Sequence, residues 1–150
     1  MDHKFEFDWQ VRRQVYEMTM QRGYPPSATE IASALDLPTT EVQAGLQRLA
    51  GGRALVLQPG SGEILMANPF SAVPTPFLVE LSLYSCYGNC IWDAMGIAAM
   101  LKQDAHIKTT CGDCGTALEL SITEGNLHGD PSVVHFAIPA HHWWDDIIFS

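Results

Sequence analysis

The sequence has few basic residues and no long apolar run. Only 8 of its 150 residues are Lys or Arg, against 17 Asp or Glu, which gives a net charge of −9 at pH 7. The shortage is concentrated in residues 61–150, where two basic residues accompany ten acidic ones. So little positive charge argues against a nucleic-acid-binding surface in that half. No stretch of about 18 apolar residues is present, so a membrane-spanning helix is not expected.

The amino terminus lacks the features of a secretory signal. Residues 1–9, MDHKFEFDW, contain neither a basic region nor an apolar core. We therefore expect a cytoplasmic protein. The sequence also lacks internal repeats and low-complexity segments. Its content of 47% hydrophobic and 17% charged residues is typical of a compact globular protein and not of a disordered one.

Residues 1–67 have the pattern of a winged helix-turn-helix. Apolar positions at helical spacing predict a helix over residues 7–21, and the capping-box sequence at residues 27–30 predicts the start of a second helix. A third helix is expected from an N-cap at Thr39 to Gly51. Two apolar runs around a Gly/Pro turn then predict a hairpin. Three helices and a hairpin together predict a winged-helix-like module.

A module of this kind suggests DNA binding through its third helix. The candidate outward residues are Thr40, Gln43, Gln47 and Arg48. Glu41 and Arg48 cancel one another across this helix, so the positive charge that neutralises phosphates is missing. We therefore favour a module that packs against the second half of the chain over one that binds nucleic acid.

A Pro-rich connector, residues 68–76 (NPFSAVPTP), separates this module from residues 77–150. Beyond the connector the patterns predict a mixed α/β module, which makes the whole chain an α+β protein. The expected elements are an extended or short helical segment over 77–84, a helix over 89–101, strands over 106–110 and 117–122 joined by a turn at 111–115, a polar turn region over 124–131 and a last strand over 133–138.

Cys90 and Asp93 are the polar residues that stand out in the predicted helix YGNCIWDAMGIAAML. At positions i and i+3 they would project from the same helix face. A carboxylic acid in apolar surroundings has a raised pKa and can hold a transferable proton near neutral pH. A thiolate is a soft donor that selects soft metals. The pair therefore suits a reaction in which sulfur holds a soft metal while a neighbouring atom receives a proton.

All four cysteines fall within 29 residues: Cys86, Cys90, Cys111 and Cys114. In a reducing compartment such clustering indicates metal binding or thiol chemistry before disulfides. Cys111 and Cys114 stand in CGDCG, a turn whose sulfurs converge and which is half of a zinc site. Cys86 and Cys90 could complete that site, in which case Cys90 would be structural. The other interpretation is a structural turn at Cys111 and Cys114, with or without a metal.

The aromatic residues and histidines near these motifs have simpler interpretations. We expect Trp92, Trp143 and Trp144 to line the core, and to form a dry wall around an apolar organic group if a site lies beside them. We expect the histidines to be a strand-edge residue and a solvated pair, and not a metal cluster. These are His135, His141 and His142.

The order of these features resembles that of the alkylmercury lyase family. The resemblance extends over essentially the whole chain, from the winged-helix-like module through TTCGDCGTALEL to VVHFAIPAHHWWDDIIF, and its most specific element is NCIWDA at residues 89–94. It implies that Cys90 binds mercury and that Asp93 takes part in delivering a proton to the leaving carbon. The family cleaves carbon–mercury bonds by protonolysis, giving a hydrocarbon and Hg(II), without an added organic cofactor.

The same resemblance implies a second active-site cysteine just after WWDDIIF. Depending on a one-residue choice of alignment, Ser150 either takes its place or directly precedes it. We expect the family's C-terminal portion to be missing from this sequence, and Cys111 could supply the second thiol. The sequence thus favours a lyase-like enzyme that meets small organomercurials and cellular thiols. The alternatives are a non-catalytic thiol- or zinc-binding protein and a winged-helix transcriptional regulator.

Overall fold

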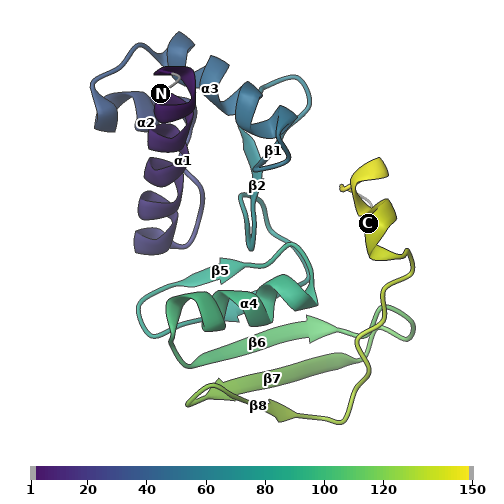
Figure 1. The fold of residues 1–150 in the computed structure, drawn as a ribbon. Coiled ribbons are helices and arrows are strands. Elements are labelled where there is room, and N and C mark those ends of the chain that lie inside the picture. Colours follow the sequence, from purple (N-terminus) through teal and green to yellow (C-terminus); the bar gives the residue numbers. More distant parts are fainter. Residues whose placement is uncertain (1–2, 149–150) are drawn as a thin grey trace.

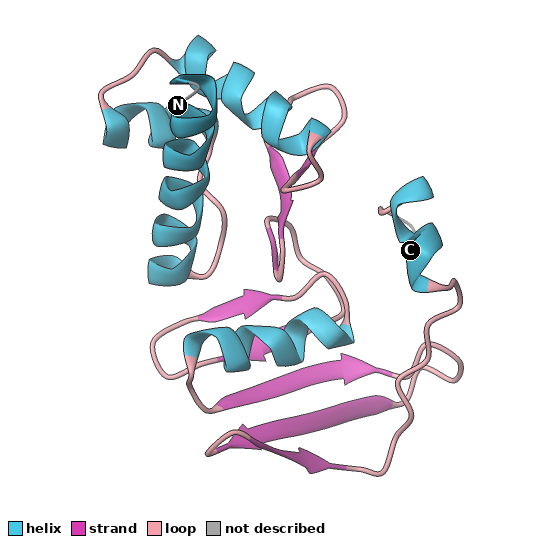
Figure 2. Cartoon of the chain, viewed as in Figure 1, coloured by secondary structure: helices cyan, strands magenta, loops and turns pink. Residues whose placement is uncertain are grey.

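The computed structural model describes residues 3–148, which form a helical part followed by a sheet with one helix on it (Figures 1 and 2). The first part contains α1 (His3–Arg22), α2 (Ala28–Leu35), α3 (Thr39–Gly51), β1 (Val56–Leu57), β2 (Ile64–Ala67) and β3 (Phe70–Ser71). The second contains β4 (Leu78–Glu80), β5 (Ser85–Tyr87), α4 (Ile91–Leu101), β6 (Ala105–Thr110), β7 (Ala117–Thr123), β8 (Asn126–Gly129) and the 3-10 helix η1 (Ala140–Asp145).

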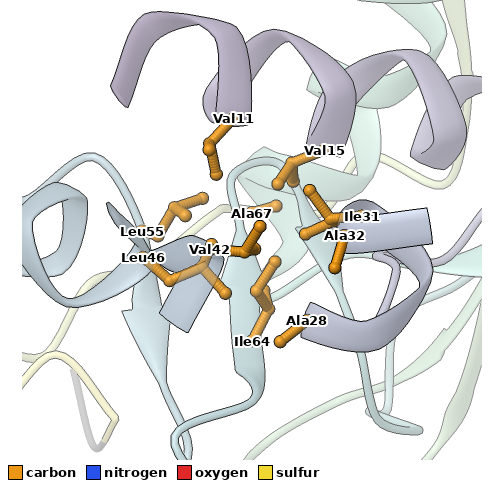
Figure 3. Packing of buried hydrophobic residues seen from close by; sticks show 10 residues of the cluster. All are labelled: Val11, Val15, Ala28, Ile31, Ala32, Val42, Leu46, Leu55, Ile64 and Ala67. Atoms are coloured by element: carbon orange, nitrogen blue, oxygen red, sulfur yellow. The ribbon is translucent and has the colours of Figure 1, made fainter. Parts of the chain in front are cut away.

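The first part is built around one hydrophobic core (Figure 3). Val15 of α1, Ile31 of α2 and Leu46 of α3 are fully buried and meet Ile64 of β2. Each such side chain contributes about 1.5–3 kcal/mol by leaving water. The three predicted helices and the predicted hairpin strands are confirmed, and β3 adds a third strand in the order β1-β2-β3.

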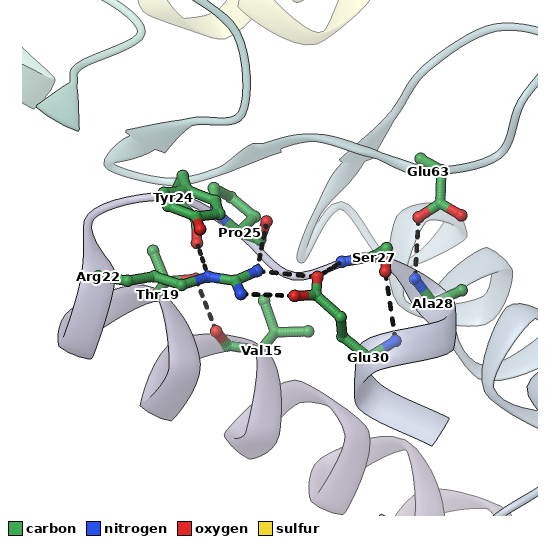
Figure 4. A network of polar contacts seen from close by, with 9 residues as sticks. All are labelled: Val15, Thr19, Arg22, Tyr24, Pro25, Ser27, Ala28, Glu30 and Glu63. Atoms are coloured by element: carbon green, nitrogen blue, oxygen red, sulfur yellow. Dashed lines mark hydrogen bonds and ion pairs between the residues drawn. The ribbon is translucent and has the colours of Figure 1, made fainter. Parts of the chain in front are cut away.

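The start of α2 has the polar contacts that the capping-box sequence predicts (Figure 4). The backbone N–H of Glu30 donates to Ser27 Oγ, and the Glu30 carboxylate accepts from the backbone N–H of Ser27. Arg22, at the end of α1, donates to both oxygens of that carboxylate at 2.6 and 2.9 Å. The predicted N-cap of α3 is wrong, because Thr39 is already helical and Pro38 precedes it without a side-chain bond.

The second part is an antiparallel sheet in the order β5-β4-β6-β7-β8, with α4 packed on one face. Val79 of β4 lies between Cys86 of β5 and Ile107 of β6, and all three side chains are buried beneath α4. Ionisable side chains at neighbouring positions contact one another instead: His106 of β6 lies 3.1 Å from both Glu80 of β4 and Glu119 of β7. The sheet thus has one apolar and one polar face, as alternation along the strands requires.

Several sequence predictions fail in the second part. The predicted polar turn over 124–131 contains β8, which pairs with β7, and β5 was not expected as a separate strand. The predicted strand over 133–138 does not form, because no described strand pairs with this segment and Val133 is 90% exposed. The predicted strands over 106–110 and 117–122 are confirmed with small extensions.

The two parts are in direct contact. The hydroxyl of Tyr16 in α1 donates to the backbone oxygen of Asn68 at 2.9 Å, and the hydroxyl of Tyr84 donates to that of Met20 at 2.6 Å. Phe70, inside the predicted connector, is buried in the core under α4. The connector is therefore a packed segment that joins both parts. Among residues 3–148, no helix has the length and apolar character needed to cross a bilayer.

Candidate active site

Cys90 is the residue that begins α4. It is the N-cap, with extended backbone angles, and its Sγ accepts a hydrogen bond from the backbone N–H of Asp93 at 3.4 Å. The prediction that both residues lie inside a helix, on one face, is therefore wrong for Cys90. The reason is that β5 ends at Tyr87 and the chain turns before helical geometry begins at Ile91. As a consequence, the thiol meets the positive end of the helix dipole, where a thiolate is stabilised.

Gly88 makes the close approach of β5 and α4 feasible. A Cβ at this position would lie 2.6 Å from the backbone nitrogen of Ala94 and 2.9 Å from its Cα. Backbone atoms cannot move aside as a flexible side chain can, so a larger residue would displace the first turn of α4. Thr75 Oγ1 also donates to the Gly88 carbonyl at 2.6 Å. Cys90 is thus placed by a tight backbone contact just before it.

The environment of the two reactive groups disfavours their charged forms. Burial raises the pKa of the Cys90 thiol; the hydrogen bond from the Asp93 N–H opposes this rise and the Asp93 charge adds to it. Burial likewise raises the pKa of Asp93, against the effect of a hydrogen bond from Asn89. The direction for Asp93 is the one expected from the apolar sequence around it. A carboxyl with a raised pKa keeps its proton closer to neutral pH.

Asn89 makes several hydrogen-bond contacts that the sequence analysis did not predict. Its side-chain nitrogen donates to Asp93 Oδ2 at 3.1 Å and to Asn68 Oδ1 at 2.9 Å, and the backbone oxygens of Pro69 and Phe70 lie at 3.3 and 3.4 Å. Its Oδ1 is buried without a hydrogen-bond partner. The available signal was an amide directly before Cys90 in an otherwise apolar segment.

Tyr16 brings α1 to the same place. Its hydroxyl bonds to the backbone of Asn68, whose side chain bonds to Asn89. Burial raises the pKa of Tyr16, the charge of Arg12 opposes the rise and the charge of Asp93 adds to it. The Asp93 charge therefore acts on a side chain of the first part. Nothing in the spacing of the sequence connects residue 16 with residue 93.

Cys111 and Cys114 come together as the CGDCG turn predicts. The turn is closed by backbone bonds from Cys111 to Thr116 at 2.8 Å and from Gly115 to Cys111 at 2.9 Å. Cys114 Sγ lies 3.1 Å from Thr116 Oγ1 and is exposed. Hydrogen bonds from Thr116, and then from the Cys111 thiol, lower the pKa of Cys114. The pair is thus an accessible dithiol.

The four cysteines do not form one site, which corrects the tetrathiolate interpretation. Cys86 is buried under α4, where burial raises the pKa of its thiol to about 11. Cys86 and Ile107 both pair with Val79, so they are two strand spacings apart, about 10 Å. Cys111 lies four residues after Ile107, which adds about 13 Å along the strand direction. Among the described residues, no group of three or more His, Cys, Asp and Glu side chains could hold a metal ion.

Cys90 and Cys111 lie at the same end of the sheet. β5 and β6 each pair antiparallel with β4, so they run in the same direction, and Tyr87 and Lys108 both face Leu78. Cys111 directly follows the end of β6, and Cys90 follows the turn after β5, at the start of α4. Cys111 is therefore at the correct end of the sheet for the role of second thiol. The Ser150 position lies outside the described residues.

The tryptophans do not line the core, contrary to expectation. Trp92 is 63% exposed on the first turn of α4. Trp143 is half-buried and donates to the backbone oxygen of Ile138 at 2.9 Å. Trp144 packs against the guanidinium of Arg53, 5.6 Å from its ring centre. These positions are at the surface because neither core extends to residues 140–145, and the cores are filled by aliphatic side chains and Phe70.

The comparisons with known proteins show the family of the chain. Residues 70–149, more than half of the chain, match the family model for alkylmercury lyase. The chain belongs to the alkylmercury lyase family. The matched range contains Asn89, Cys90 and Asp93 as well as the Cys111–Cys114 turn.

The fold is also similar to that of a solved structure. The structure is described as the mercury-bound form of MerB2, and it aligns with a TM-score of 0.65 at 18% sequence identity. The match covers 82% of this chain and 61% of that one, so this chain spans less than two thirds of its length. No curated protein matches the chain. The mixed helix and sheet architecture expected from the sequence is thus confirmed.

Proposed function

We propose that this protein cleaves carbon–mercury bonds in organomercurials by protonolysis, releasing a hydrocarbon and Hg(II). The observation that carries the proposal is the placement of a thiol and a carboxyl together at the start of α4, in a chain of the alkylmercury lyase family. Cys90 Sγ lies 3.4 Å from the Asp93 nitrogen, and the Asp93 carboxyl is held by Asn89. A soft ligand and a buried acid are the two groups that this chemistry needs.

The proposed reaction begins when Cys90 captures R–Hg⁺ from a cellular thiol. A sulfur–mercury bond to Cys90 forms as the bond between mercury and the cellular thiolate breaks. The proton of Cys90 goes to the departing cellular thiolate. A second protein thiol then releases its proton to solvent and binds mercury as a thiolate, which weakens the bond to carbon. Asp93 passes its proton to that carbon as the carbon–mercury bond breaks. The electron pair of the carbon–mercury bond forms the new C–H bond, and Asp93 regains a proton from solvent after this cleavage. The hydrocarbon leaves, and Hg(II) stays on the thiolates until cellular thiols remove it.

Two side chains support this scheme from outside the pair. Cys111 is our candidate for the second thiol, because it lies at the same end of the sheet as Cys90. Buried Cys86 is a poor candidate, because its high pKa leaves little thiolate. Exposed Trp92 stands one residue before Asp93 and offers an apolar surface to the organic group.

We further propose that the first part is a winged-helix-like module with a structural role in a cytoplasmic enzyme. Thr40, Gln43, Gln47 and Arg48 are exposed, as the sequence analysis expected. Arg48 is neutralised, however, because its guanidinium donates to both oxygens of Asp8 at 2.6 to 3.1 Å. The outward face of α3 therefore carries little of the free positive charge that phosphate binding requires.

Release of hydrocarbon from an organomercurial tests the proposed activity. The protein is incubated with phenylmercuric acetate and excess thiol, and benzene is measured by gas chromatography. We expect turnover by wild type and by Cys86→Ala, a variant of a cysteine outside the site. We expect none above background for Cys90→Ser. Equal rates for wild type and Cys90→Ser would refute the proposal.

A second candidate function, thiol or zinc binding without catalysis, is favoured by the Cys111–Cys114 dithiol. The two cysteines belong to one turn closed by backbone hydrogen bonds, and Cys114 is exposed. Zinc in structural sites has four ligands, and in the described part of the chain no third side chain joins these two. Metal analysis of protein purified without added zinc tests this function. It predicts about one zinc per chain, lost in Cys114→Ser, whereas a folded, metal-free protein contradicts it.

A further inference from the structure

We propose that Asn89 is a positioning residue for Asp93, and that Tyr16 of α1 holds Asn89 in place through Asn68. The first part of the chain would then form one wall of the catalytic site. This inference rests on the proposed function, since it concerns the group that delivers the proton. It is carried by a continuous set of hydrogen bonds from Tyr16 through Asn68 and Asn89 to Asp93.

The first step is the amide of Asn89. An amide nitrogen has two hydrogens, and this one has four acceptor oxygens within 3.5 Å. The two shortest contacts, to Asn68 Oδ1 at 2.9 Å and Asp93 Oδ2 at 3.1 Å, account for both hydrogens. Rotating the amide by 180° would place its oxygen against these acceptors. The orientation is therefore fixed even though Asn89 Oδ1 is buried without a partner.

The second step is the effect on Asp93. Because the amide can only donate here, Asp93 Oδ2 must act as an acceptor. The transferable proton therefore resides on Oδ1, the oxygen that Asn89 does not hold. A carboxyl fixed at one oxygen presents the other in a single direction, which reduces the orientational freedom lost on reaching the transition state. Asn89 thus selects both the rotamer of Asp93 and the oxygen that transfers the proton.

The third step leads back to α1. Asn68 lies between β2 and β3, and its backbone oxygen accepts from Tyr16 Oη at 2.9 Å, across 52 residues of sequence. Its side chain in turn accepts one of the two hydrogens of Asn89. A shift of Asn68 would remove one of the two acceptors that orient the amide, and the backbone oxygens of Pro69 and Phe70 would then compete with Asp93 for its hydrogens. Tyr16 fixes Asn68 against that shift.

Substitution of Asn89 tests the amide. In Asn89→Ala, we expect kcat to fall about tenfold or more while KM changes less than about twofold, because the lost bond is to an ionisable group that acts in the transition state. Asn126→Ala is the matched control, since Asn126 Nδ2 also donates at a turn, to the Glu124 backbone, and begins β8, at the opposite edge of the sheet from β5. It should leave both constants unchanged. Unchanged kcat in Asn89→Ala overturns the inference.

Two tyrosines provide a matched test of α1. Tyr16→Phe and Tyr84→Phe each remove one hydroxyl that donates to a backbone oxygen between the two parts, but only Tyr16 connects to Asp93. We expect kcat to fall about threefold or more in Tyr16→Phe and to stay unchanged in Tyr84→Phe. In the double variant Tyr16→Phe/Asn89→Ala the losses should not add, because both act through one network. Additive losses, or equal effects of the two tyrosines, overturn the role of Tyr16.

A measurement without turnover separates this inference from the proposed function. Three-bond NMR couplings to the carboxyl carbon of Asp93 report its χ1 rotamer. We expect one rotamer in wild type and Tyr84→Phe, and averaged couplings in Asn89→Ala. A fixed rotamer in Asn89→Ala overturns the positioning role. If benzene release fails while the couplings behave as expected, the proposed function is wrong and the positioning of Asp93 by Asn89 stands.

Discussion

Asn89 Nδ2 and Asp93 Oδ2 are joined by a hydrogen bond of 3.1 Å that spans the first turn of α4. Cys90, between them in sequence, caps the same turn with its sulfur. The beginning of one helix therefore carries the proposed mercury ligand, the proposed acid and the group that orients the acid. All three residues belong to NCIWDA, the most specific part of the family resemblance.

Asp93→Asn separates mercury capture from bond cleavage. The amide retains an oxygen that can accept from Asn89 but has no proton to transfer. We expect kcat to fall by about 10² to 10⁴, the range found when a general acid is removed. Cys90 should still bind phenylmercury, as located by peptide mass spectrometry. Loss of binding in this variant would indicate that Asp93 supports the ligand and not the proton transfer.

The cysteines should differ in their reaction with iodoacetamide. At pH 7.5 a thiol with a pKa of about 11 has about 100-fold less thiolate than one with the ordinary value of 9, and Cys86 is also buried. Cys114 is exposed and its pKa is lowered. We expect rapid labelling of Cys114 and almost none of Cys86 in the folded protein, by peptide mass spectrometry. All four should react similarly in urea, and fast native labelling of Cys86 would contradict its placement.

Glu30 should make the stability of the first part depend on pH. Hydrogen bonds from Arg22, and then from Ser27, lower the pKa of Glu30 from 4.5 to about 2. The stabilisation is therefore complete above the unfolded value of 4.5 and is lost as the pH falls towards 2. Because the pair is partly exposed, solvent screening limits it to roughly 1 kcal/mol.

Glu30→Gln measures this contribution. We expect it to be less stable than wild type by roughly that amount at pH 7 and equal to it near pH 2, by urea unfolding. Glu17→Gln is the control, since it removes one oxygen of an exposed i,i+4 pair with Arg13 and should change stability less. A difference between Glu30→Gln and wild type that persists at pH 2 would show that the effect is not electrostatic.

Gly88→Ala should damage the site through the backbone. Its Cβ would lie 2.6 Å from the nitrogen of Ala94, so α4 must move away from β5. We expect a loss of about 1–3 kcal/mol in the free energy of unfolding, typical of overpacking, together with a loss of activity. Gly60→Ala is the control for backbone strain without crowding. A Cβ at this position meets no atom within 4 Å, but the residue has a positive φ of 87°. Unchanged activity in Gly88→Ala would mean that the first turn tolerates the shift.

Periodicity predicted the regular elements well and the positions of reactive groups less well. The apolar spacing of Ile31 and Leu46 reflects burial in a core, so the helices around them were predictable. Cys90 was misplaced because a thiol is not a standard N-cap residue, and the apolar run around it suggested helix throughout. Val133 to Ile138 has strand-forming residues, but a strand also needs a neighbour, which local sequence does not specify.

The long-range contacts around the candidate site could not be predicted from local sequence patterns. Cys111 and Cys114 were predictable as a converging pair because a four-residue turn determines their proximity. Tyr16, Asn68 and Asn89 are brought together by the packing of α1 against the connector, and contacts across 52 residues leave no periodic trace. Family resemblance predicted Cys90 and Asp93 as site residues but did not predict the side chains around them.

The proposed role of the hydrogen bond between Tyr16 and Asn68 has a consequence for the size of an active fragment. A polypeptide that starts at Phe70, where the family match begins, would retain Asn89, Cys90 and Asp93 but neither Asn68 nor Tyr16. In such a fragment the Asn89 amide would have lost its shortest contact. Minimal versions of this protein, whether for bioremediation or for transplanting the site to another scaffold, should therefore carry α1 with them or replace its tyrosine by an equivalent support.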